Sequence, residues 1–166
     1  MADSTLAELL YGKGAHASPI ACVEDVSLEL AGRRIESYSH SIGQTVAHVN
    51  YWMSYELKRI RGESPTYPAH AAESWPENAA PSSESAWHAE VARFTELLGE
   101  LAALAESSEE ILQRKIPATE KDYPKHATLH AVLWATAVHN TYHVGQIALL
   151  RRAFGAWPPR GGGDSW

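Results

Sequence analysis

Cysteine is almost absent from this sequence of 166 residues, which contains only Cys22. A single cysteine cannot form an intramolecular disulfide, and it cannot build a zinc site from several thiolates. The residues around Cys22 include no basic side chain that would lower the pKa of its thiol. We therefore expect no disulfide framework, no cysteine zinc site and no activated thiol nucleophile.

Long apolar runs and basic clusters are also missing. No apolar run approaches the roughly 20 residues of a transmembrane helix, and the N-terminal stretch lacks the basic start and apolar region of a signal peptide. The net charge is −6 and the longest basic cluster is Arg151-Arg152, whereas duplex binding normally needs a basic patch. We therefore expect a cytoplasmic protein that binds neither membranes nor nucleic acids.

The remaining composition is that of an ordinary globular domain, with 45% hydrophobic and 20% charged residues. A chain near this length buries roughly 70% of the surface that its unfolded form exposes, which is enough for a real core. We therefore treat residues 1–166 as a single domain. Two counts are unusual, nine histidines and six tryptophans. No two histidines are adjacent, which excludes an artificial tag.

Helical periodicity dominates the chain. Apolar residues recur at steps of three and four between Ser39 and Gly62, which predicts a helix with one buried face. Two more long helices are predicted, one capped by Ser82 or Ser83 and ending near Glu106, and one from about Thr128 to Phe154. Shorter helices are expected at Ser4 to Tyr11, after Pro19, around residues 27–34 and after Ser107. Because no segment shows strand alternation, we predict an all-α four-helix bundle with short extra helices.

Two segments interrupt this pattern. Residues 63–81 contain four prolines and no hydrophobic period, which predicts a long connection anchored by Trp75. Residues 155–166 are rich in glycine and proline, and Trp157 and Trp166 predict an ordered tail that packs back on the domain. Each segment could shape the mouth of a pocket or a dimer interface, and the sequence does not separate these alternatives.

Two histidines near the C-terminus have the spacing of a metal-binding pair. His139 and His143 lie four residues apart, so a helix places one imidazole a turn above the other. A metalloprotease HExxH helix has this spacing, but here Asn140 replaces the glutamate that acts as general base, so such a protease is not expected. Residues within about 40° of His139 on the helix are mostly apolar, which places the pair in the middle of an inward face.

A third ligand would turn the pair into a site, and His48 is the best candidate because it borders the buried face of another long helix. Three neutral imidazoles leave a fourth position open, as in catalytic zinc centres. The alternative is two buried histidines that hydrogen-bond within the core. A second pair, His126 and His130, faces elsewhere and is expected to be structural. Surface or capping roles are expected for His16, His40, His70 and His88.

Two runs of sequence resemble the DinB (damage-inducible), YfiT-like family of four-helix metalloproteins: HNTYHVGQIALLRRAFGAWPP with its trailing GGDSW, and SHSIGQTVAHVNYW. The pattern H-x3-H-x-G-Q-I-x-x-L-R is the most specific part, and the similarity covers nearly the whole chain. The resemblance implies metal ligands that match His48, His139 and His143. It also implies a divalent ion such as nickel or zinc, a frequent homodimer, and relatives that include hydrolases and thiol-dependent transferases or isomerases using mycothiol or bacillithiol.

The sequence offers three further candidate pocket residues but no evident general base. Gln146, one turn beyond His143, could order a ligand or pack in the core. Tyr142 could be a pocket wall or a dimer contact, and Trp52, one turn from His48, is favoured as a core residue over a substrate platform. Arg151 and Arg152 could hold a carboxylate or a thiol cosubstrate, but their place at a helix end favours interaction with the helix dipole.

Three functions are therefore considered. The first is a metal-dependent enzyme whose three-histidine ion activates water, or a low-molecular-weight thiol, for reaction with a small-molecule substrate. The second is a non-catalytic stress-response or interaction module that the ion stabilises by clamping two helices. The third is a helical interaction protein with buried histidines and no metal.

Overall fold

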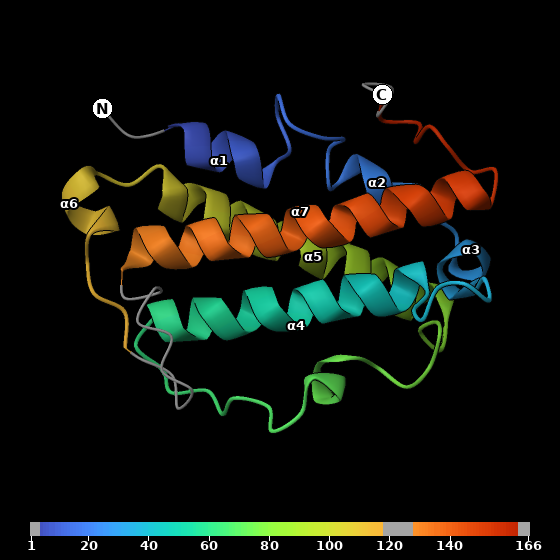
Figure 1. The fold of residues 1–166 in the computed structure, drawn as a ribbon, viewed down its shortest axis with the longest axis horizontal. Helices are drawn as coiled ribbons and strands as arrows, with labels where there is room; N and C mark the ends of the chain where they lie inside the picture. Colours follow the sequence, from blue (N-terminus) through green and yellow to red (C-terminus); the bar gives the residue numbers. More distant parts are fainter. Residues whose placement is uncertain (1–3, 118–127, 163–166) are drawn as a thin grey trace.

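Three long helices form the body of the molecule, which a computed structural model describes for residues 4–117 and 128–162 (Figure 1). They are α4 (Ile42–Ile60), α5 (Glu84–Ala105) and α7 (Leu129–Ala153). α4 packs against both α5 and α7. The remaining elements are short: α1 (Ser4–Leu10), α2 (Ala21–Glu24), α3 (Leu28–Gly32), the 3-10 helix η1 (Ala71–Ser74) and α6 (Glu109–Leu112). The prediction of an all-α fold with short extra helices is confirmed.

Short N-terminal helices take the fourth place in the bundle. α1 packs on α5 and α7, α2 packs on α7, and α3 packs on α4. In the described part of the chain, β-type pairing is limited to one isolated antiparallel bridge between Lys115 and Thr128. The described residues therefore form no sheet. None of the described helices is long and apolar enough to span a membrane.

Side-chain caps decide where the long helices begin. α4 starts at Ile42 rather than Ser39, because Ser41 and Gln44 form a capping box in which each side chain accepts from the other's backbone N–H. Thr128 caps α7 by accepting from the Ala131 N–H, and Ser83 caps α5 in the same way.

The core lies between α4, α5 and α7 and is filled by large apolar side chains. Trp87 and Phe94 on α5 and Met53 on α4 are fully buried. The indole N–H of Trp87 donates to the carbonyl of Val26 at 2.6 Å, which ties α5 to the segment between α2 and α3. A buried indole whose N–H is bonded stabilises the packing without leaving a polar group unsatisfied.

The long connection at residues 63–81 lies along α4 instead of projecting from the bundle (Figure 1). Gln44 donates to the carbonyl of Pro76 at 2.6 Å, and the Ser41 hydroxyl donates to the carbonyl of Ala79. Gly43 permits this close approach, since a Cβ there would lie 3.1 Å from the Ala79 oxygen. The connection therefore forms an outer wall over α4.

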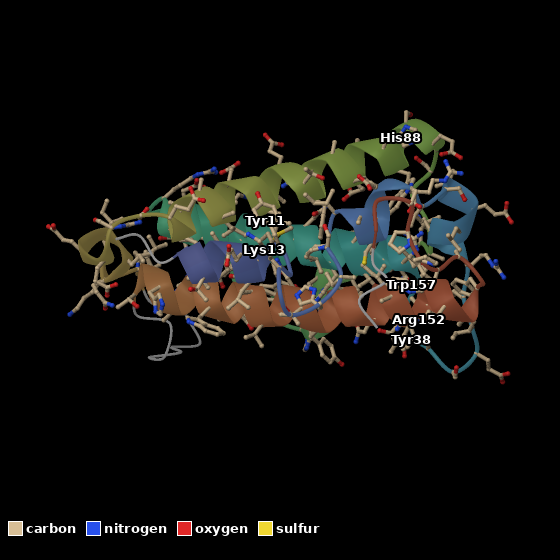
Figure 2. The ribbon with its side chains drawn as sticks, turned by 90° about the horizontal axis from the view of Figure 1, so that it is seen from above. Tyr11, Lys13, Tyr38, His88, Arg152 and Trp157 are labelled. Atoms are coloured by element: carbon tan, nitrogen blue, oxygen red, sulfur yellow. The ribbon has the colours of Figure 1, made fainter. Side chains whose placement is uncertain are left out.

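The C-terminal end of α7 is tied to α2 by a buried ion pair. Arg151 contacts the Asp25 carboxylate at 2.6 Å and also donates to the carbonyls of Cys22 and Ala156. Arg151 lies in the last turn of α7, as the expected dipole interaction requires, and it also holds a carboxylate of its own chain. Arg152 lies over the ring of Trp157, so the tail packs back as expected as far as the described residues extend (Figure 2). Trp166 lies outside them.

Candidate metal centre

Three imidazoles converge at the contact between α4 and α7. The His139 Nε2 lies 3.3 Å from the His48 Nε2 and 3.1 Å from the His143 Nε2. One ring nitrogen from each residue falls within 4.8 Å of the others. His48 and His143 are buried, with 6% and 5% of their surface exposed, and His139 is half-buried. The three residues predicted from the sequence therefore form one cluster that is compatible with a metal site.

The hydrogen bonds of the outer ring nitrogens fix two of the tautomers. The His48 Nδ1 donates to Ser74, whose carbonyl lies at 3.2 Å and whose hydroxyl gives its own proton to Ala71. The His143 Nδ1 donates to the Gln146 Oε1 at 2.7 Å. In a neutral imidazole the second nitrogen is then an unprotonated acceptor. Nε2 of His48 and Nε2 of His143 therefore both present lone pairs toward His139.

Hydrogen bonding alone cannot satisfy this arrangement. A neutral His139 could donate its Nε2 proton to the Nε2 of His48 or to that of His143, but not to both. The Nε2 lone pair of the histidine that receives no proton would then face the His139 nitrogen without a hydrogen atom between them. Zinc bound to nitrogen at 2.0–2.1 Å in tetrahedral geometry separates its ligand atoms by about 3.4 Å. The two observed separations, 3.3 and 3.1 Å, are close to that value. The third pair of ring nitrogens, from His48 and His143, also lies within 4.8 Å, so the cluster is compatible with a divalent cation.

The environment keeps all three imidazoles neutral. Burial, followed by the neighbouring imidazoles, lowers the pKa of His48 to about 3 and that of His139 to about 4. Burial also lowers the pKa of His143, although the bond to Gln146 acts in the opposite direction. Metal ligation requires neutral imidazole, so at neutral pH no proton has to be removed before a cation binds.

A stack of rings holds the 63–81 connection against the cluster. Trp75 lies between two imidazoles, with ring centroids 3.8 Å from His48 and 3.7 Å from His40, and both pairs are nearly parallel at 9°. The prediction that Trp75 anchors the 63–81 connection is confirmed, because its ring stacks between those of His40 and His48. His40 was expected to have a surface or capping role, but its Nδ1 is buried in this stack. Sequence reasoning found neither His40 nor Ser74 as neighbours of the site.

α7 presents its inward face in a different direction from the one predicted. His139 lies at the border of this face, and the buried residues near the pair are Thr136, Ala137, Asn140, His143, Val144 and Ile147. The prediction that both histidines occupy the middle of the face is therefore wrong for His139. This border position leaves the third imidazole half-buried.

A cavity of about 390 Å³ adjoins His48 and His139. It is lined by His48, Trp52, Glu56 and Arg59 of α4, by Tyr67, Ala71 and Ser74 of the connection, and by Ala135, Thr136 and His139 of α7. The volume lies within the range of small-molecule sites. The 63–81 connection therefore lines a pocket, whether or not it also contributes to a dimer interface.

The other candidate residues divide by location. Trp52 is half-buried and lines this cavity. Tyr142 is 65% exposed and lines a second, open hollow on the outside of α7. Gln146 lines neither hollow and instead bonds to His143. Burial raises the pKa of Cys22 to about 11, which agrees with an unreactive thiol.

The remaining histidines do not join the cluster. His16 contacts the Thr141 hydroxyl, His70 and His88 are exposed, and His130 lines the open hollow with Tyr142. His126 lies outside the described residues. Among the described residues, no further histidine, cysteine or carboxylate offers a ligand atom to the cluster. The described residues therefore offer three candidate ligand atoms to a metal ion.

Replacing Gln146 by leucine is expected to weaken zinc binding about 10–100-fold, because outer hydrogen-bond partners fix the tautomer and orientation of a ligating histidine. The affinity is measured by competition with a chromophoric chelator. Gln113→Leu is the matched control, since Gln113 is exposed and bonds only to Glu109 in the described structure. An unchanged affinity in Gln146→Leu would show that His143 needs no outer partner.

Comparison with known proteins assigns the chain to a family. The DinB superfamily model matches residues 18–147, a range that includes all three clustered histidines. No curated protein and no solved structure matches the chain. The resemblance predicted from the H-x3-H run and the earlier histidine segment is thereby confirmed. The chain belongs to the DinB superfamily.

Proposed function

We propose that the protein is a metal-dependent enzyme in which His48, His139 and His143 hold a zinc or nickel ion. The observation that carries the proposal is the convergence of three Nε2 atoms, two of them fixed as unprotonated acceptors, beside a cavity. Imidazole ligands suit both metals, and affinity order alone does not choose between them. When bound, such an ion acidifies a coordinated water or thiol.

The surrounding residues support a reactive site over a purely structural one. Structural zinc sites normally have four protein ligands, whereas catalytic sites keep one position open. The described residues supply three ligands, and the cavity begins at two of them, His48 and His139. Ser74 and Gln146 hold the imidazoles of His48 and His143 in place by accepting hydrogen bonds from the Nδ1 atoms of these rings. Trp52 and Ala135 add apolar surface to the wall of the cavity.

The reaction that fits best is attack by an activated water or by a low-molecular-weight thiol on a small molecule in the cavity. No lining residue is placed as a free general base next to the imidazoles. Glu56 lines the cavity but is paired with Arg59 at 2.6 Å, and it lies two helical turns beyond His48. Activation by the metal would remove the need for such a base. The hydrolase and thiol-transferase alternatives differ in the nucleophile, which is water in the first and the thiol in the second, and in the class of molecule that it attacks.

The test combines metal analysis with turnover. Protein purified without chelator is expected to contain about one divalent ion per chain, and the zinc-loaded form is expected to consume either an ester panel or an electrophile panel with added mycothiol or bacillithiol. His139→Ala should lose both metal and turnover. Stoichiometric metal with no turnover on either panel would instead favour the non-catalytic, metal-stabilised module. Absence of bound metal would contradict both.

We also propose that the chain forms a homodimer through the outer face of α7. Trp134, Val138 and Tyr142 are large, exposed and spaced four residues apart, so they form one apolar stripe. Large exposed apolar patches on a helix face commonly mark interfaces. Light scattering of the full chain would test the dimer, and Val138→Glu places a charge in the middle of the stripe.

A further inference from the structure

Two aromatic side chains line the cavity beside the histidines, Trp52 of α4 and Tyr67 of the 63–81 connection. Trp52 follows His48 by four residues and precedes Glu56 by four, so it lies about 6 Å along the helix axis from each. Both aromatic residues are half-buried. The metal-site proposal gives neither of them a task.

Neighbouring rings restrict the orientation of the Trp52 indole. Its ring centroid lies 5.3 Å from that of Tyr51 and 5.4 Å from that of Tyr55, with interplanar angles of 84° and 70°. Edge-to-face contacts at such distances are a favoured arrangement of aromatic rings. Because this wall of the cavity is already ordered, a ligand that packs on it does not have to immobilise a free side chain.

The rings of Trp52 and Tyr67 form a corner in the cavity wall. Their planes are inclined by 52°, and their centroids are 5.4 Å apart. Tyr55 packs edge-to-face on Tyr67 at 5.8 Å and 90°. A flat ring that stacks on one plane of the corner meets the other plane at an angle, and both offset-stacked and edge-to-face contacts are favourable. A saturated group would bury apolar surface there but would gain neither contact.

The charge and the size of the cavity also suit an uncharged ring. Among the described lining residues, the charged side chains other than the histidines are those of Glu56 and Arg59, which pair with each other at 2.6 Å. A cavity of about 150 Å³ lined by apolar side chains is enough to bind benzene. The volume of about 390 Å³ therefore holds a ring together with a reacting group.

We propose that the substrate carries an aromatic ring that packs against Trp52 and Tyr67, about one helical turn from the reacting group at the histidine cluster. The inference rests on the proposed metal-dependent function, because the reacting group is assigned to the cluster. Trp52 acts as a platform for the substrate as well as a packing residue of α4. Together with Tyr67 it selects aromatic over saturated substrates.

Three hydroxamates test this substrate class on the zinc-loaded wild-type protein. Each carries a hydroxamate head for zinc and the same short alkyl link, roughly 6 Å long to match the rise from His48 to Trp52. The link ends in a phenyl, a cyclohexyl or a hexyl group, so the number of carbon atoms is the same. The phenyl compound is expected to bind about fivefold more tightly than either of the others, the size of an aromatic contact beyond area burial. Isothermal titration calorimetry gives the three affinities.

Trp52→Leu should abolish the phenyl preference, because leucine keeps an apolar surface but has no ring. Trp52→Phe should keep the preference, since it retains an aromatic face. Trp157→Leu is the matched control and should also keep it, because Trp157 is a half-buried tryptophan that packs under Arg152, outside the cavity (Figure 2).

Two results would overturn the inference. The first is the absence of a phenyl preference in the wild type, a comparison that needs no variant to fold. The second is a phenyl preference that survives both Trp52→Leu and Tyr67→Leu. The Tyr67 substitution lies in the connection, outside the three long helices, and is expected to reduce the preference on its own.

A zinc titration of the same samples separates this inference from the function on which it rests. Stoichiometric zinc uptake without a phenyl preference refutes the substrate class and leaves the metal site standing. Failure to take up zinc refutes the proposed function, and the substrate class falls with it.

Discussion

Zinc is expected to raise the melting temperature of the wild-type chain by about 5–10 °C and to leave that of His139→Ala unchanged. A ligand that binds only the folded state at 100 times its dissociation constant stabilises that state by about 2.7 kcal/mol. For a domain of this size each kcal/mol corresponds to roughly 2–4 °C. The effect arises because the three ligands come from α4 and α7, so the ion connects helices that unfolding would separate.

His139 is the best position for this test because it lies at the border of the buried face. Replacing His48 or His143 would also remove buried volume from the core, whereas His139→Ala removes mainly a ligand. His88→Ala is the matched control, since His88 is exposed and outside the cluster. Differential scanning calorimetry with and without zinc measures the shift. An equal shift in wild type and His139→Ala would show that zinc binds elsewhere.

Asp25→Ala is expected to destabilise the fold by about 3 kcal/mol, because it leaves the buried Arg151 guanidinium without its counter-charge. The remaining bonds of Arg151 to the carbonyls of Cys22 and Ala156 keep the loss at the lower end of the range for broken buried pairs. Glu29→Ala is the control, as Glu29 is an exposed acidic residue on the neighbouring α3. Urea unfolding at neutral pH measures both free energies.

The loss of unfolding free energy caused by Asp25→Ala depends on pH. Burial acts to raise the pKa of Asp25, but the hydrogen bonds from Arg151 and the Arg160 backbone, with the charge of Arg151, outweigh it and lower the pKa below the usual value. The stabilisation is therefore present above the unfolded-state pKa of about 3.9 and is lost as the pH falls through the folded-state pKa. The difference between wild type and Asp25→Ala should narrow below about pH 4. A difference that stays constant to lower pH would exclude the charge of Asp25 as its cause.

The long helices and the ligand set could be predicted from the sequence because both follow from local periodicity. The spacing of His139 and His143 needs only a helix, and His48 was selected because it borders an apolar stripe. The sequence alone does not locate the start of α4, since the choice of Ser41 over Ser39 as N-cap depends on the Gln44 side chain. The direction of the buried face of α7 could not be predicted, because residues near the histidine pair are apolar on more than one side of the helix.

The surroundings of the site could not be predicted, because they depend on how the 63–81 connection folds over α4. Nothing local indicates that Trp75 stacks between His40 and His48, or that Ser74 accepts from His48. Glu56 and Arg59 have a spacing that usually marks a solvated helix surface, and only the covering chain buries them. Arg151 likewise becomes a buried partner of Asp25 only when α2 packs on α7.

Zinc K-edge X-ray absorption of the zinc-loaded chain tests the central claim most directly, because it reports the atoms bound to the metal. The three-histidine site predicts three imidazole nitrogens at about 2.0–2.1 Å and additional light-atom scattering from the group in the open position. His139→Ala should lose this spectrum. A spectrum with a sulfur neighbour, or one without imidazole scattering, would contradict the assignment of His48, His139 and His143 as the ligands.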